Sequence, residues 1–194
     1  MAGHARYTAL LDANVLYPIA ICDALMEVAI TGIYAPKWTQ LIDEEWIRNL
    51  AKDRNQSEEK FHIRRDRMHD ACPDWEVPFE AWKALESSLN LPDPDDRHVL
   101  AAAIAGHADS IVTMNLKDFP QETLDLFDIT VLHPDDFLYQ QLELQPYVVL
   151  PAFKEMRARL QNPEFTPAAF TDRLEQKYGL VQTASFLRDA QQLI

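Results

Sequence analysis

The chain has 194 residues, of which 47% are hydrophobic and 10% aromatic, so it is long enough for one ordinary globular domain and too apolar for a disordered chain. Its 18 basic and 31 acidic side chains give a formal net charge of −13. This charge excludes a general polyanion binder with a basic surface, and any contact with nucleic acid must be local.

The sequence also predicts a cytosolic protein. No stretch approaches the roughly 20 apolar residues of a membrane-spanning helix, and Asp12 interrupts the first apolar run, so a secretory signal is not expected. The two cysteines, Cys22 and Cys72, are too few for a disulfide framework and lack the spacing of zinc ligands.

Short apolar runs alternate with segments of helical periodicity in the first part of the chain. The predicted elements are, in order, a strand over 7–11, a loop over 13–17, a helix over 19–29, a strand over 33–35 and a helix over 41–50 with Thr39 as its N-cap. The pattern is therefore strand, helix, strand, helix.

The middle of the chain continues this alternation. The predicted elements are a charged surface helix over 57–71, a short strand over 75–77, a helix over 80–87, an alanine-rich helix from about 96 to 105, and strands over 110–113 and 129–132. Short strands that are apolar throughout, each followed by a helix, predict an α/β fold with a mainly parallel sheet between helices.

Beyond about residue 134 only helical patterns occur, over 137–144, 150–160, 167–178 and 180–193. We therefore expect an α/β domain over residues 5–133 and a helical C-terminal extension over 134–194 that packs on it.

Four acidic residues occupy positions near the carboxyl ends of the predicted strands, where ligands collect in open α/β sheets. Asp12 ends the first strand, and Glu45 lies on the helix after the second strand. Asp96 opens the helix before strand 110–113, and Asp118 lies in the loop after that strand. Carboxylates that converge repel one another unless a cation neutralises them, and an all-oxygen site favours Mg²⁺ or Mn²⁺.

Each of these acids also has a structural interpretation, because aspartate is common in turns and helix caps. Asp93 and Asp95 compete with Asp96, and Glu44 competes with its neighbour Glu45. Asp118 fits either a metal ligand or an anchor of its own loop.

Three longer strings carry a family resemblance: LDAN at 11–14, PDPDDRHVLAAA at 92–103 and VTMNLKDFP at 112–120. Together with a helical glutamate at 44 or 45, they resemble the PIN-domain nucleases over about residues 5–133. Within that superfamily the chain is most similar to the toxins of VapBC-type toxin–antitoxin pairs. The resemblance implies a three-layer α/β/α fold, Mg²⁺ or Mn²⁺ held by the acids, and cleavage of single-stranded RNA.

Carried onto this chain, the resemblance gives Asp12, Glu45, Asp96 and Asp118 as the catalytic acids, with Asp12, Asp96 and Asp118 as metal ligands. A threonine stands six residues before Glu45, at position 39, as is usual in the family, which favours Glu45 over Glu44. The resemblance also suggests side chains that orient the carboxylates or touch substrate: Asn14, Thr113 and Asn115.

The implied reaction is hydrolysis of RNA phosphodiesters to 5′-phosphate and 3′-hydroxyl ends. The implied partners are an RNA substrate, a cognate antitoxin protein and a second copy of the chain in a homodimer; the antitoxin is expected on the C-terminal helices or beside helix 19–30. Two alternatives stay open: a PIN-type nuclease of RNA maturation or DNA processing, and a catalytically silent PIN-like binding module. A haloacid-dehalogenase phosphatase is rejected, because it needs a second aspartate where this chain has Asn14.

Basic residues near the predicted site are candidates for contact with RNA. Lys60, Arg64 and Arg67 fall on one face of a predicted helix. They either contact phosphate groups or form a solvated face with ion pairs inside the helix. Arg97, beside the predicted site, either neutralises a carboxylate or binds a phosphate. His98, two helical positions after Asp96, is expected to point away from the acids.

Overall fold

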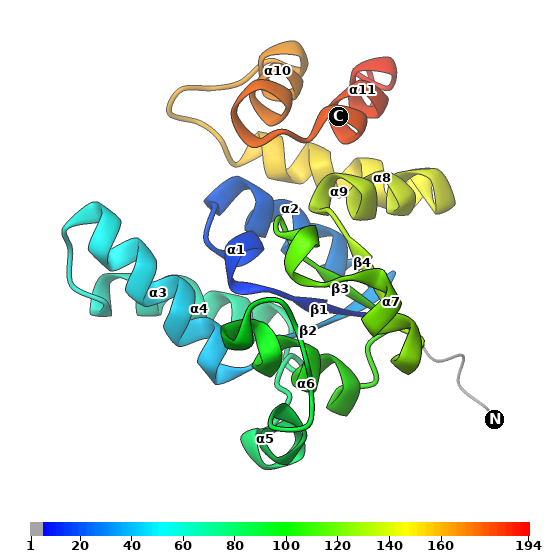
Figure 1. Ribbon diagram of the computed structural model, residues 1–194. Coiled ribbons are helices and arrows are strands. Elements are labelled where there is room, and N and C mark those ends of the chain that lie inside the picture. The colour runs from blue at the N-terminus through cyan, green and yellow to red at the C-terminus, as the bar shows by residue number, and fades with distance from the viewer. Residues whose placement is uncertain (1–5) are drawn as a thin grey trace. The chain divides into compact units, whose positions relative to one another are not determined.

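A computed structural model describes residues 6–194, so the predicted domain boundary at residue 5 lies outside the described residues. The chain forms two compact units (Figure 1). The first contains residues 6–18 and 34–133, and the second contains residues 19–33 and 134–194. The segment 19–33 thus groups with the C-terminal helices, and the predicted division at residue 134 stays a prediction.

The first unit is built on a four-stranded parallel sheet. Its strands are β1 (Tyr7–Leu11), β2 (Tyr34–Lys37), β3 (Ser110–Val112) and β4 (Thr130–Leu132), in the order β2-β1-β3-β4. All three residues of β3 are buried, as are the last three of β1, which explains why both strands are mainly apolar. The predicted α/β class with a parallel sheet is confirmed.

Helices follow the strands of this unit. They are α1 (Ala13–Leu16), α3 (Gln40–Arg54), α4 (Glu59–Ala71), α5 (Phe79–Glu86), α6 (Arg97–Ala105) and α7 (Gln121–Leu124), with 3₁₀ turns η1 (Pro94–Asp96), η2 (Leu116–Asp118) and η3 (Asp125–Phe127). Helices α3 and α4 run beside each other (Figure 1).

Local signals explain the two helices that carry candidate site residues. The Thr39 hydroxyl accepts the N–H of Ile42 at the start of α3, and Asn55 ends that helix in the left-handed conformation. Helix α6 ends at Gly106, where an added Cβ would lie 2.9 Å from a methyl carbon of Val77. Glycine therefore permits a close approach of α6 to that chain segment.

Three local predictions were wrong. Residues 13–16 form helix α1 and not a loop, because the chain turns immediately after Asp12 and the N–H groups of Val15 and Leu16 donate to the Asp12 carbonyl. Residues 75–77 form no strand; Glu76 makes an isolated bridge with Trp38. A short helix, α7, follows Pro120, where no helix was predicted.

The second unit is helical throughout. It comprises α2 (Ile19–Ile30), α8 (Pro134–Leu144), α9 (Pro146–Ala158), α10 (Pro167–Tyr178) and α11 (Val181–Asp189). Phe137, Phe153 and Phe170 are buried. The buried carboxylate of Asp135 accepts the N–H groups of Gln182 and Thr183 over 2.8 and 2.9 Å, and so caps α11 from another helix.

Within residues 6–194, no helix combines the length and the apolar character that a membrane span requires.

Candidate active site

The register of the sheet brings the end of β1 against the end of β3. Leu11 pairs with Val112, and the backbone N–H of Asp12 continues the ladder by donating to the Val112 carbonyl over 3.1 Å. The next residues along the two strands, Asp12 and Thr113, therefore stand side by side at the carboxyl edge of the sheet.

A hydrogen-bond network fixes the Asp12 carboxylate. The hydroxyl of Thr113 donates to Asp12 Oδ2 over 2.7 Å, and the Asn14 amide donates to the same oxygen over 2.6 Å. Asn14 Oδ1 in turn accepts the N–H of Met114, and Thr113 Oγ1 accepts the N–H of Asn115. The loop after β3 thus orients the two side chains that hold Asp12.

The environment of Asp12 opposes its ionisation. Burial is the main cause that raises the pKa of Asp12, to about 6, and the negative charge of Glu45 acts in the same direction. The hydrogen bond from Thr113 and the charge of His98 partly offset this rise in pKa. The carboxylate is thus held ionised at neutral pH against an unfavourable environment.

Asp96 lies among the other acids. It ends turn η1 and stands at the N-cap of α6, half-buried. Burial and then the charges of four carboxylates raise the pKa of Asp96 to about 7; these carboxylates belong to Asp12, Asp93, Asp118 and Glu45. The charges of all three other predicted catalytic acids therefore act on Asp96, and these acids come from the end of β1, from α3 and from η2.

The two aspartates that competed with Asp96 are placed differently. Asp93 caps turn η1, because its Oδ1 accepts the N–H of Asp95 over 2.9 Å, and its charge adds to the acidic cluster. Asp95 is exposed and is not among the groups that shift the pKa of Asp96.

The structure also separates the two neighbouring glutamates. Glu45 is half-buried and lines a hollow with Asn14. Glu44 is exposed and lines two other hollows, both with Gln40. One of these hollows includes His69 and the other includes Trp82. Of the two, Glu45 is the glutamate that faces Asp12 and Asp96.

His98 does not point away from the acids, contrary to expectation. Its side chain is buried, and Nε2 lies 3.7 Å from Glu45 Oε2. The expectation failed because Asp96 ends the 3₁₀ turn η1 whereas His98 lies in α6, so α-helical spacing between positions 96 and 98 does not give their relative direction. No contact of His98 was predicted from its sequence position.

The loop after β3 supplies the fourth acid. Asp118 is half-buried in η2, and its charge contributes to the raised pKa of Asp96. Asn115 is exposed and reaches the network through its backbone N–H, whereas its side-chain role stays a prediction.

The basic residues that were candidates for RNA contact differ in their surroundings. Arg64 on α4 donates to the carbonyls of Leu16 and Tyr17 at the end of α1, and its guanidinium lies 4.7 Å from the ring centre of Trp46. Lys60 and Arg67, on the same helix, are exposed. Arg97 is half-buried, and its Nε finds no hydrogen-bond partner among the residues that the structure describes.

The donor set of this cluster fits a hard divalent cation. Across residues 6–194, no three histidine, cysteine or acidic side chains converge closely enough to form a complete protein cage for a metal. Mg²⁺ does not need such a cage, because it usually keeps several waters and binds one or two carboxylates together with substrate phosphate oxygens. Asp12 and Asp96, whose pKa values are raised by burial and by neighbouring carboxylates, offer such a pair.

Comparison with known protein families gives a match over most of the first unit. The PIN domain family matches residues 8–117, which is more than half of the chain. The chain belongs to the PIN domain family. The PIN match contains Asp12, Glu45 and Asp96 and ends one residue before Asp118.

The second unit has a separate match. Residues 134–189 match the VapC50 C-terminal domain. Over 79 residues the chain is 46% identical to a Mycobacterium tuberculosis protein named "Putative ribonuclease VapC50"; this segment is 41% of the chain and 47% of that protein. The chain therefore spans about half the length of this relative. The predicted resemblance to the VapC branch of PIN domains is confirmed.

Proposed function

We propose that this PIN domain is a ribonuclease that hydrolyses RNA phosphodiesters with the help of Mg²⁺ or Mn²⁺. The observation that carries the proposal is the raised pKa of the half-buried Asp96, about 7, which results from burial and from the charges of neighbouring carboxylates that include Asp12, Asp118 and Glu45. Such repulsion is relieved by a divalent cation, and a bound cation supplies charge neutralisation and a water of lowered pKa.

The residues of the chain have distinct tasks in this proposal. Asp12 and Asp96 would hold the metal, the charges of Asp118 and Glu45 act on Asp96, and Glu45 lies beside His98. Asn14 and Thr113 keep the Asp12 carboxylate in one orientation by donating to its Oδ2.

The reaction adds water to the scissile phosphate. The water oxygen forms a bond to phosphorus, the bond from phosphorus to the 3′-oxygen breaks, and the 3′-oxygen leaves with a proton. The products are a 5′-phosphate and a 3′-hydroxyl end.

The match of residues 134–189 to the VapC50 C-terminal domain, and the 79-residue similarity to a protein named as a putative ribonuclease VapC50, support a biological role as the toxin of a toxin–antitoxin pair, acting on RNA in the cytoplasm and bound by an antitoxin protein. Expression of the chain alone should arrest bacterial growth, and co-expression of a protein encoded beside it should relieve the arrest. Growth arrest that persists in Asp12→Asn would contradict a role that depends on catalysis.

The activity is tested by incubating the purified protein with single-stranded RNA in Mg²⁺ or Mn²⁺. Asp12→Asn and Asp96→Asn should lower cleavage by about 100-fold or more. Asp95→Asn is the matched control, because Asp95 adjoins Asp96 but is exposed and outside the acidic cluster. Full cleavage by Asp96→Asn together with loss in Asp95→Asn would move the site away from the proposed cluster.

A further inference from the structure

A protein with net charge −13 needs local cations to hold a polyanion, and helix α3 carries two of them close in sequence to Glu45 of the candidate active site. Arg48 and Lys52 lie on α3, three and seven residues after Glu45. At 1.5 Å of rise per residue, they stand roughly 5 and 10 Å farther along the helix axis. Both side chains are exposed, and neither forms an ion pair within residues 6–194.

A hollow connects Lys52 with the acids. Its volume is about 320 Å³, and its lining includes Asn14, Tyr17, Glu45, Asn49, Lys52 and Asp53. Two of these residues, Asn14 and Glu45, belong to the candidate active site. The hydroxyl of Tyr17 donates to Asp53 Oδ2 over 2.7 Å, so the acid that follows Lys52 in the chain has another partner.

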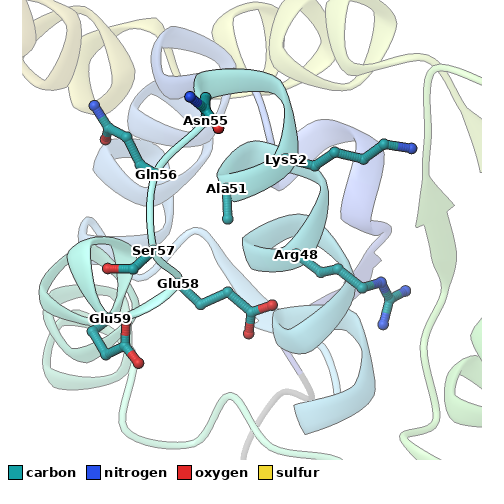
Figure 2. A pocket seen from close by; sticks show the side chains of 8 residues that line it. All are labelled: Arg48, Ala51, Lys52, Asn55, Gln56, Ser57, Glu58 and Glu59. Carbon is teal, nitrogen blue, oxygen red and sulfur yellow. The ribbon is translucent and has the colours of Figure 1, made fainter.

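A second hollow, of about 630 Å³, shares Lys52 with the first, and its lining includes Arg48 together with the acids Glu58 and Glu59. Figure 2 shows that the side chains of Arg48 and Lys52 extend from α3 toward the same side, away from Ser57 and Glu59. The two cations therefore share one side of the helix, and Lys52 borders both hollows.

We propose that Arg48 and Lys52 form a phosphate-binding stripe, the α3 stripe, that guides the backbone of a single-stranded RNA away from the scissile phosphate, with Asn49 in the hollow beside it. The proposal rests on the proposed ribonuclease function and adds the path of the substrate. Flexible single strands can follow a groove of this kind, and each cation that meets a phosphate releases a counterion.

The competing path runs along α4, where Lys60, Arg64 and Arg67 were predicted to share a face. Arg64 already donates to the carbonyls at the end of α1, which divides that face. The α3 stripe, in contrast, shares its hollow with Glu45 and Asn14.

The test measures binding of a fluorescent single-stranded RNA to the full chain in an Asp12→Asn background, which keeps the RNA intact, between about 50 and about 200 mM salt. Removal of one phosphate contact lowers the steepness of log K against log salt by about 0.7 for a single strand. Lys52→Ala and Arg48→Ala should each show this change and weaker binding, the double variant should show about twice the change, and Lys52→Arg should restore the slope.

Lys60→Ala on α4 is the matched control and should leave the slope unchanged. An unchanged slope in Lys52→Ala and Arg48→Ala, or a change confined to Lys60→Ala and Arg67→Ala, would overturn the α3 stripe. If wild-type protein still cleaves RNA in that case, the ribonuclease proposal stands without the stripe. If wild-type protein neither cleaves nor binds RNA, both proposals fail.

Discussion

Replacement of Asp12 by asparagine should stabilise the metal-free protein at alkaline pH while it removes a catalytic carboxylate. Burial raises the pKa of Asp12 from 3.8 to about 6. One pKa unit corresponds to about 1.4 kcal/mol, so ionisation of this group costs the folded state on the order of 3 kcal/mol above pH 7. Two hydrogen bonds to the carboxylate, from Asn14 and Thr113, weaken in the amide variant and offset part of this gain.

The sign follows from proton binding. Between about pH 4 and pH 6 the folded state holds a proton on Asp12 that the unfolded state has lost, so the free energy of unfolding falls as pH rises through this window. Asp12→Asn lacks that fall. We expect a net stabilisation of about 1–2 kcal/mol at pH 8, or roughly 2–8 °C in Tm for a chain of this size.

The assay is thermal unfolding of wild type and Asp12→Asn in excess EDTA at pH 4 and at pH 8. The difference in Tm should be large at pH 8 and vanish or reverse at pH 4. Added Mg²⁺ should then stabilise the wild type, by about 2.7 kcal/mol at 100 times Kd, and leave the variant unchanged. A variant that is less stable than wild type at both pH values would refute the argument from burial and repulsion.

Three further substitutions follow from the same structure. Asp43→Asn makes the same chemical change at a buried aspartate whose oxygens accept the indole N–H groups of Trp38 and Trp46. It should lower the free energy of unfolding, measured by chemical denaturation, by about 2 kcal/mol or more. A stabilised variant would contradict this. Asn14→Ala should lower the cleavage rate by about 10- to 100-fold with little change in Tm, and full activity would show that its bond to Asp12 is dispensable. Asp135→Ala removes the cap of α11 and should cost about 1–2 kcal/mol in the same denaturation assay, whereas an unchanged midpoint would show that the two N–H groups find water instead.

The sequence was most informative where the structure of a segment depends on the residues of that segment alone. The apolar runs at Tyr7–Leu11 and Ser110–Val112 predicted buried parallel strands, and the position of Asp12 after the first run placed it at the carboxyl edge of the sheet. Helix α9 shows the limit of such signals: the prediction began at residue 150, but the helix starts at Pro146 and continues through Pro151. Proline inside a helix opposes local propensity, so propensity alone places the start of this helix too late.

Contacts between distant segments could not be predicted in the same way. The rotation of α3, which turns Glu45 and not Glu44 toward Asn14, follows from burial of Trp46 and Ile42 on the core side of the helix. The hydrogen bonds from Arg64 to the end of α1 link it to Tyr17 and Leu16, which precede it in the chain by 47 and 48 positions. Helical spacing alone predicts neither the rotation of α3 nor the contact of Arg64. Spacing shows which residues share a face of the helix, but it does not show which other element packs on that face.

The chemistry of the RNA ends after cleavage tests the proposed active site most directly. We expect the wild-type protein, in Mg²⁺ or Mn²⁺, to give fragments with 5′-phosphate and 3′-hydroxyl ends, and we expect these fragments to disappear in excess EDTA and in Asp12→Asn. Fragments that end in a 2′,3′-cyclic phosphate and persist in EDTA would contradict hydrolysis at the carboxylate cluster.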